Sequence, residues 1–220
     1  MMEIKQVAVF RSPLAEKFGL PRQAGLAPSL RGVIEFLPGY DAPEAFRGLE
    51  GFERLWILWE FNLNRGEDWH PTVRPPRLGG NERIGVWASR SPYRPNPIGL
   101  SCVKIEAVNP EKGTIEVSGA DIADGTPIYD VKPYLAYSDA HPGVREGFAG
   151  GEWKPLEVVI PEPMAGFFSK DELRALEEIL AQDPRPAYQD DPERDYGLAF
   201  AGRNVRFKVK DGVLTVAAVL

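Results

Sequence analysis

Residues 99–118, GLSCVKIEAVNPEKGTIEVS, contain two runs of alternating apolar and polar residues with a short turn between them. Alternate residues of the first run share one face of an extended chain: Ser101, Val103, Ile105 and Ala107. Asn109-Pro110 and Lys112-Gly113 are typical turn residues, and TIEVS (114–118) follows them. The stretch therefore predicts two antiparallel strands, the first half exposed.

Short strand patterns also fill the rest of the first two thirds of the chain. The runs are MMEIKQVAVF (1–10), GVIEF (32–36), LWILWEF (55–61) and GVW (85–87). One short helix is expected to open at Asp41, with Glu44 three residues later. No strand–helix–strand alternation and no glycine-rich phosphate motif occurs, so a mainly β fold with a single antiparallel β-barrel is expected.

The carboxy-terminal part of the chain has a different character. SKDELRALEEILAQ (169–182) predicts a helix that Ser169 and Glu172 open as a capping box. Its apolar face is formed by Leu173, Leu176, Ile179 and Leu180. Asp211-Gly212 between two alternating runs then predicts a hairpin. We expect a β-barrel domain over 1–160 and a small α+β domain over 161–220.

Composition limits the class of protein. The 220 residues are 43% apolar and 26% charged, which is typical of a globular chain. No apolar run is long enough for a transmembrane helix, and no secretory signal is recognisable at the start. The single cysteine, Cys102, and two histidines argue against an internal disulfide and against a cysteine- or histidine-rich metal centre. We expect a cytoplasmic protein with no metal and no membrane contact.

Positive charge is concentrated in one part of an acidic chain. The net charge is −6, yet residues 1–100 hold 13 Lys and Arg against 11 Asp and Glu, while 101–220 hold 13 against 21. Between 70 and 104 the only acid is Glu82, and the basic residues are Arg74, Arg77, Arg83, Arg90, Arg94 and Lys104. This distribution indicates an anion-binding site.

The first candidate site is PTVRPPRLGGNERIGVWASRSPYRPNPIGLS (71–101), here called the proline-rich segment. Prolines at 92, 95 and 97 interleave with Arg90, Arg94 and Asn96. Because proline fixes the backbone, the guanidinium groups would project from a stiff loop, which suits recognition of a carboxylate or phosphate. The alternative is a surface turn with solvated arginines.

Carboxylates gather in a second candidate, GADIADGTPIYDVKPY (119–134). Asp121, Asp124 and Asp130 could bind a metal, hold ribose hydroxyls or act as a general base, although the spacing of an EF-hand is absent. A purely structural turn is the alternative. Two further polar loops are KFGLPRQAGLAPSLRG (17–32) and AQDPRPAYQDDPERDY (181–196). In the latter, an arginine beside a tyrosine could pair with a phosphate and stack on a base.

These motifs, together with EAFRGLEGFERLWILWEF (44–61), resemble the TsaA-like family, also called TrmO, over nearly the whole chain. The tail with DPRPAY (183–188) resembles the long bacterial form. The resemblance implies an S-adenosylmethionine-dependent tRNA methyltransferase built on a single β-barrel. The expected reaction is methylation of the N(6) nitrogen of threonylcarbamoyladenosine at position 37 of tRNA, by a homodimer with its cofactor pocket near the subunit interface.

The resemblance also implies a set of cofactor-binding residues. Carried over motif by motif, they are Arg22, Gln23, Ala24, Asn62, Arg90, Leu100, Asp124, Gly125, Thr126 and Pro127. Asn62 stands where the family often has histidine. Arg90 suits the methionine carboxylate.

Methylation of a carbamoylated nitrogen requires removal of a proton, and Asp124 is our candidate base, with Asp130 as the alternative. We expect Arg74, Arg77, Arg94 and Arg185 to contact phosphate or the threonyl carboxylate of an anticodon loop, alongside Asp183 and Tyr188. Two other functions stay open: a methyltransferase acting on another RNA or a small molecule, and a non-catalytic barrel that binds single-stranded RNA.

Overall fold

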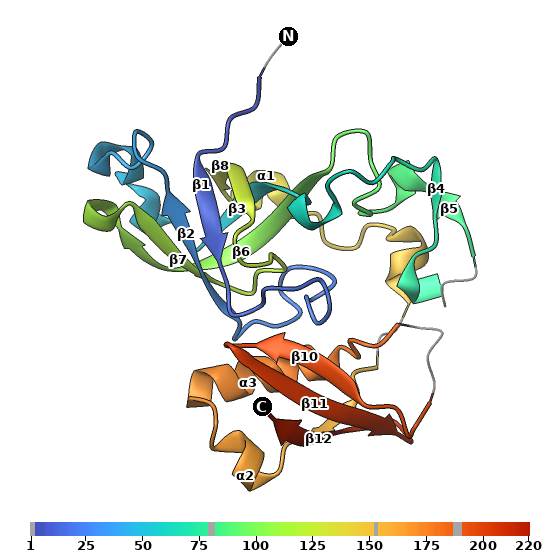
Figure 1. The fold of residues 1–220 in the computed structure, drawn as a ribbon. Helices are drawn as coiled ribbons and strands as arrows, with labels where there is room; N and C mark the ends of the chain where they lie inside the picture. Colours follow the sequence, from blue (N-terminus) through green and yellow to red (C-terminus); the bar gives the residue numbers. More distant parts are fainter. Residues whose placement is uncertain (1–2, 79–81, 152–153, 187–190) are drawn as a thin grey trace.

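Six strands close into an antiparallel barrel in the computed structural model, which describes all residues except 1–2, 79–81, 152–153 and 187–190. Around the barrel the order is β1-β2-β7-β6-β3-β8 (Figure 1). The strands are β1 (Ala8–Arg11), β2 (Arg31–Phe36), β3 (Arg54–Glu60), β6 (Ile98–Asn109), β7 (Thr114–Ser118) and β8 (Pro127–Pro133). The predicted mainly β fold with one antiparallel barrel is confirmed.

Residues 99–118 form β6 and β7, as predicted, but the alternation along β6 breaks at a β-bulge. The register of the pair shifts between Ile105 and Ala107. Ser101 and Val103 are buried as predicted, whereas beyond the bulge Val108, and not Ala107, packs against the barrel core. A bulge adds one residue to a strand and so moves the following side chains to the opposite face.

Two local predictions in the barrel domain are wrong. The helix expected at Asp41 is a single 3₁₀ turn, η1 (Pro43–Phe46), and the Asp41 carboxylate accepts a hydrogen bond from the Gly39 backbone N–H instead of capping it. Only Gly85 of the predicted GVW strand is extended, because Val86–Ala88 forms a 3₁₀ turn, η5. β8, whose run of residues begins and ends with proline, was not predicted as a strand.

A second, four-stranded sheet lies below the barrel in the view of Figure 1. Its order is β10-β11-β12-β9, with β9 (Glu157–Val159), β10 (Tyr196–Phe200), β11 (Arg203–Lys210) and β12 (Val213–Val219). β9 runs parallel to β12, so this sheet begins ahead of residue 161, where the sequence analysis divides the chain. The expected hairpin forms between β11 and β12 around Asp211 and Gly212.

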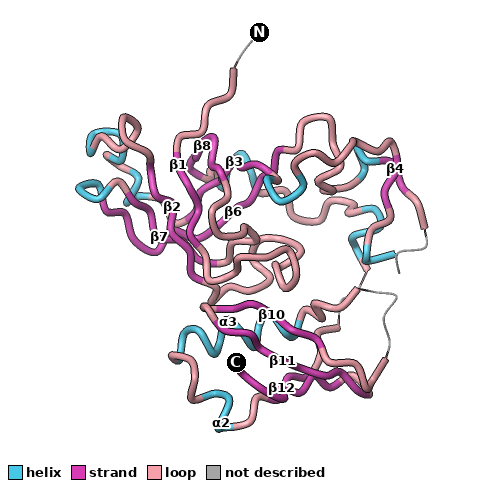
Figure 2. The backbone as a smooth tube through the Cα atoms, viewed as in Figure 1, coloured by secondary structure: helices cyan, strands magenta, loops and turns pink. Residues whose placement is uncertain are grey.

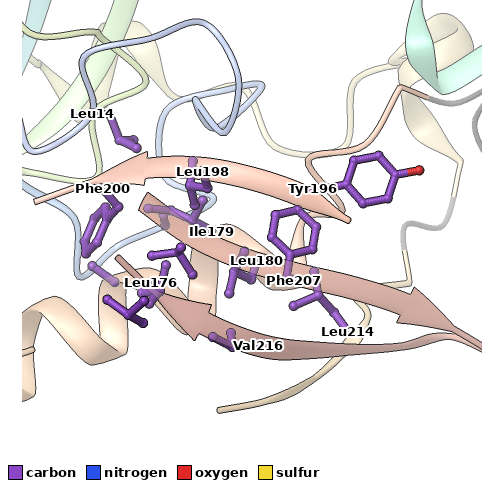
Figure 3. Close-up of a cluster of buried hydrophobic side chains, with 14 of the residues drawn as sticks. Leu14, Leu176, Ile179, Leu180, Tyr196, Leu198, Phe200, Phe207, Leu214 and Val216 are labelled. Atoms are coloured by element: carbon purple, nitrogen blue, oxygen red, sulfur yellow. The ribbon is translucent and has the colours of Figure 1, made fainter. Parts of the chain in front are cut away.

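The helix α3 (Lys170–Ala181) packs against this sheet. Ser169 and Glu172 form the predicted capping box at its start. Leu176, Ile179 and Leu180 are buried against Phe200 and Phe207 in the cluster that Figure 3 shows. Leu14, from the loop that follows β1, joins the same cluster, as does Leu30. The amino-terminal loop (12–30) therefore joins the barrel to the second sheet through a shared core.

The proline-rich segment extends away from the barrel and carries the two-stranded sheet of β4 (Thr72–Val73) and β5 (Ile84–Gly85), as Figures 1 and 2 show. The remaining short elements are η2 (Leu49–Gly51), η3 (Asn62–Asn64), η4 (Pro76–Leu78), η6 (Pro110–Lys112), α1 (Ala136–Asp139), η7 (Gly147–Gly150) and α2 (Glu162–Ala165). Within the described part of the chain, no helix has both the length and the apolar character that crossing a bilayer requires.

Candidate functional site

A cavity of about 420 Å³, here called the central cavity, opens where four parts of the chain meet. The ends of β3 and β6 contribute Trp59 and Leu100, and the amino-terminal loop contributes Lys17, Leu20, Pro21, Arg22 and Gln23. The proline-rich segment supplies Arg90 and Arg94, and the loop between β7 and β8 (119–126, the aspartate loop) supplies Asp121, Ala123 and Thr126. The proline-rich arginines and the aspartate loop, which the sequence placed in one site, thus line the same cavity.

Two polar contacts join the amino-terminal loop to other parts of the chain, one to the proline-rich segment and one to Glu67 after η3. Arg90 donates a hydrogen bond to the side-chain oxygen of Gln23. Lys17 forms an ion pair with Glu67 at 3.3 Å. Tyr93 also interacts with Glu67, and this hydrogen bond is the main cause that raises the pKa of the Tyr93 hydroxyl. Lys17, Gln23 and Arg90, which take part in these contacts, line the central cavity.

The floor is built by a chain of hydrogen bonds. The indole N–H of Trp59 donates to the Ser101 hydroxyl at 2.9 Å, and this hydroxyl donates to the Asp121 carboxylate. Trp59 lies over Gly99, since a Cβ atom there would stand 2.2 Å from the indole ring. A larger residue at 99 would displace the ring, so glycine allows the tryptophan to form the floor.

Electrostatically, the central cavity is mostly positive. Among the described residues that line it, the basic side chains are Lys17, Arg22, Arg90 and Arg94, and Asp121 is the one acid. Burial raises the pKa of Asp121, while the Ser101 hydrogen bond and the charge of Arg90 oppose that shift. The cavity therefore offers an anion site beside a single, partly buried carboxylate.

Six of the ten expected cofactor residues line the central cavity: Arg22, Gln23, Asn62, Arg90, Leu100 and Thr126. The Thr126 hydroxyl, which is buried, donates to the Asn62 side-chain oxygen at 3.1 Å. Ala24, Asp124, Gly125 and Pro127 are not among the described residues that form its wall. Each of these four is adjacent in sequence to a residue that does line the wall: Gln23, Ala123 or Thr126.

Neither candidate base lines either of the two cavities in the described part of the chain. The Asp124 carboxylate accepts a hydrogen bond from the Ser12 backbone N–H at 3.0 Å. Asp130 pairs with Lys132 at 2.7 Å, and both side chains are about half exposed. Of the three aspartates that the sequence grouped, the structure brings only Asp121 to the cavity.

A second cavity of about 390 Å³ adjoins the first and shares part of its wall, including Lys17 and Arg22. Asp183 and Arg185 line it from the carboxy-terminal domain. Their side chains pair at 2.9 Å and 3.0 Å through two guanidinium nitrogens, and the Arg22 guanidinium donates to the Asp183 carbonyl oxygen at 3.2 Å. Asp183 and Arg185 of the DPRPAY motif therefore lie beside residues of the barrel domain that flank the central cavity.

The other expected substrate residues are more scattered. Arg74 is exposed and lies outside both cavity walls as described. Arg77 lies in η4, and its side chain is outside the described part of the structure, as is Tyr188. Arg94 lines the central cavity, where its guanidinium donates to the carbonyl oxygens of Val86 and Ser89 and lies 5.2 Å from the Trp87 ring.

Sequence reasoning missed three parts of this site. The sequence motifs assign no functional role to Lys17, Ser101 or Trp59, although Lys17 and Trp59 line the central cavity and Ser101 bonds Trp59. A single lysine in a loop, such as Lys17, does not indicate a binding role in the sequence. The alternation of β6 placed Ser101 on the inner face of the strand, and a polar residue on that face was the signal that could have been used.

Comparisons with known proteins agree with this geometry. The model of the tRNA-methyltransferase O N-terminal domain matches residues 9–140, and the model of the TrmO C-terminal domain matches residues 155–220. The tRNA (adenine(37)-N6)-methyltransferase of Escherichia coli K12 is 39% identical over 234 aligned positions, which cover 99% of this chain and 97% of that protein. The protein of the same name from Eikenella corrodens is 44% identical over 171 positions, 77% of this chain and 97% of that protein.

Among solved structures, TrmO from Pseudomonas aeruginosa superposes with a TM-score of 0.83 at 31% identity, covering 100% of this chain and 98% of that chain. The similarity therefore includes both the barrel and the carboxy-terminal sheet. The family that the sequence motifs indicate is confirmed: this chain belongs to the tRNA-methyltransferase O (TrmO) family.

Proposed function

We propose that this protein transfers the methyl group of S-adenosylmethionine to the N(6) nitrogen of threonylcarbamoyladenosine at position 37 of tRNA. The observation that carries the proposal is the central cavity, in which the family motifs of the amino-terminal loop, the proline-rich segment and the aspartate loop meet. Its volume of about 420 Å³ lies within the range of small-molecule and cofactor sites. Full-length similarity to tRNA (adenine(37)-N6)-methyltransferases supports the same reaction.

The lining of the central cavity suits the cofactor. The bound cofactor would supply a methyl group on a sulfonium, ready for in-line displacement. Arg90, which Gln23 orients, would pair with the methionine carboxylate. Asn62 and Thr126 offer polar atoms for the ribose or adenine, and Trp59 and Leu100 offer apolar surface. Orientation of the two reactants is the main contribution that such a site can make, worth about 7–11 kcal/mol.

The second cavity is the proposed place for the threonylcarbamoyl group. It adjoins the central cavity at Arg22, so a group bound there would lie next to the transferred methyl. Arg185 is only 11% exposed and is held by Asp183, which gives a fixed cation for the threonyl carboxylate. We further propose that the exposed Arg74, together with Arg77 and Arg94, contacts the phosphates of the anticodon loop. Tyr188 would stack on a base of that loop.

We also propose that the protein acts in the cytoplasm as a homodimer. Two large apolar side chains are exposed near the central cavity. Leu100, in its wall, is 54% exposed, and Trp87, in the proline-rich segment, is 69% exposed. A second copy of the chain would cover them. Light scattering should give the mass of a dimer at micromolar concentration, and a Trp87→Glu variant should give the mass of a monomer.

The reaction is tested with tRNA that carries threonylcarbamoyladenosine and with the same tRNA prepared without the modification. Purified protein and S-adenosylmethionine are added, and the digested nucleosides are weighed by mass spectrometry. A mass gain of one CH₂ on the modified adenosine alone supports the proposal. Gain on the unmodified tRNA would indicate a methyltransferase of different specificity, and tRNA binding without any gain would indicate a non-catalytic RNA-binding barrel.

A further inference from the structure

Asp121 is the carboxylate that the aspartate loop delivers to the central cavity. The loop itself is buried, with Ile122 and Ala123 in the protein interior, while the Asp121 side chain reaches the cavity wall. Of the three acidic residues in the 119–134 motif, Asp124 and Asp130 are engaged elsewhere, with Ser12 and Lys132. Asp121 is therefore the aspartate of this motif that can contact a ligand in the central cavity.

Its carboxylate is held in a fixed orientation. The Ser101 hydroxyl donates to one carboxylate oxygen and is itself fixed by the Trp59 indole N–H. Backbone N–H groups of Ala24 and of Asp121 itself also stabilise the charged form. A side chain that is supported by donors from the amino-terminal loop, β3 and β6 is preorganised to face a ligand.

The charges around Asp121 point to the kind of group that it binds. Arg90 lies close enough for its charge to favour the ionised carboxylate, and both residues line the central cavity. A cation and an anion side by side match the carboxylate and ammonium of a free amino acid group. Burial raises the pKa of Asp121 more than its hydrogen bonds and the charge of Arg90 lower it. A bound cation would therefore stabilise the ionised carboxylate further.

We propose that Asp121 binds the α-ammonium group of the methionine moiety of S-adenosylmethionine, while Arg90 binds its carboxylate. This inference rests on the proposed function, since it assigns one end of that cofactor. It gives Asp121 a role in cofactor selection: ligands that keep the amino acid end bind well, and ligands that lack it bind poorly.

Three ligands separate the possible roles of Asp121. S-Adenosylmethionine carries the sulfonium and the amino acid, S-adenosylhomocysteine carries the amino acid without the sulfonium charge, and 5′-methylthioadenosine carries neither. Calorimetry on the full-length protein measures each affinity for the wild type and for Asp121→Asn. We expect the variant to bind the first two ligands about 10- to 100-fold more weakly, the range of a lost charge-assisted hydrogen bond. Its affinity for 5′-methylthioadenosine should stay within about twofold of the wild-type value.

Asp171→Asn is the matched control, because Asp171 is an exposed aspartate in the first turn of α3. It should leave all three affinities unchanged. Ser101→Ala is the second variant, which keeps the carboxylate and removes its hydrogen bond, and it should weaken S-adenosylhomocysteine selectively by about 3- to 10-fold. This variant also decides the matter if Asp121→Asn does not fold.

Several results would overturn the inference. Weaker binding of S-adenosylmethionine alone would mean that Asp121 faces the sulfonium. Equal losses for all three ligands would mean that it only maintains the fold of the cavity, and unchanged affinities with lost turnover would make it a group that acts on the substrate. If the wild type binds none of the three ligands, the proposed function itself fails, and the inference fails with it.

Discussion

Arg90 and Gln23 lie 67 positions apart in the sequence and are joined by a hydrogen bond across the rim of the central cavity. One comes from the proline-rich segment and the other from the amino-terminal loop. The bond fixes the direction of a guanidinium group that is otherwise exposed. The anion site of the cavity is therefore a product of two motifs and exists only in the folded chain.

The Gln23→Ala substitution tests this relationship. Without its partner Arg90 should lose orientation, so the affinity for S-adenosylhomocysteine should fall by about 3- to 10-fold, the range of one hydrogen bond. Calorimetry measures the change. Gln6→Ala is a suitable control, since the Gln6 side chain bonds only the nearby Ala8 carbonyl oxygen among the described contacts. Wild-type affinity in the Gln23 variant would show that Arg90 needs no such support.

The floor of the cavity is tested by Gly99→Ala. The added methyl group would stand 2.2 Å from the Trp59 ring, so the ring must move, which should weaken its hydrogen bond with Ser101. We expect the free energy of unfolding to fall by about 1–3 kcal/mol and cofactor binding to weaken. Gly85→Ala is the control, because a Cβ atom at 85 meets no atom within 4 Å and the residue has a φ of −61°. Equal stability of the two variants would contradict the packing described here.

The proposed base is tested by Asp124→Asn. To act as the base, the Asp124 carboxylate has to turn from the Ser12 backbone N–H towards the substrate when tRNA binds, and removal of its charge should then lower the rate of methyl transfer by about 100-fold or more. Cofactor affinity should change little, because the Asp124 carboxylate faces the Ser12 backbone and not the central cavity wall. Single-turnover kinetics with modified tRNA measures the rate. Unchanged turnover together with unchanged affinity would remove Asp124 from the mechanism.

A pH-dependent contribution to stability is expected at the bulge of β6. Glu106 accepts hydrogen bonds from Ser118 at 2.6 Å and pairs with Arg31 at 2.8 Å. These contacts, led by that of Ser118, lower the pKa of Glu106 from 4.5 to about 2. Because the folded-state pKa is depressed, the stabilisation is complete above about pH 4.5 and is lost as the pH falls towards 2.

Glu106→Gln should therefore be less stable than the wild type at pH 7, by about 1–2 kcal/mol, and this difference should shrink as the pH falls from 4.5 through about 2. Urea unfolding at several pH values measures it. The control is Glu177→Gln, an exposed position of α3, which should match the wild type throughout. A constant difference between the Glu106 variant and the wild type across this pH range would contradict the assignment.

Local patterns in the sequence predict the parts of the fold that depend on local rules. The capping box of Ser169 and Glu172 and the hairpin at Asp211-Gly212 form as expected, because each depends on residues a few positions apart. The bulge after Ile105 depends on the register with β7, which alternation within β6 does not contain. The break in the core face at Val108 therefore appears only in the structure.

In the candidate site, too, some features follow from local sequence motifs and others depend on contacts between distant parts of the chain. The motifs place Arg90, Gln23 and the aspartate loop in one pocket, but they do not decide which aspartate enters it. Gly119 and Gly125, with φ of +77° and +74°, set the path of the loop, so that Asp121 reaches the cavity while Asp124 turns to Ser12. The choice between residues three positions apart is thus made by backbone torsions and by partners from distant strands.

A crystal structure of the protein with S-adenosylhomocysteine is the most direct measurement of where the cofactor binds. We expect ligand density in the central cavity, with the carboxylate of the ligand at Arg90 and its ammonium group at Asp121. Density at any other place on the barrel, or in the central cavity with the amino acid end directed away from both residues, would contradict it.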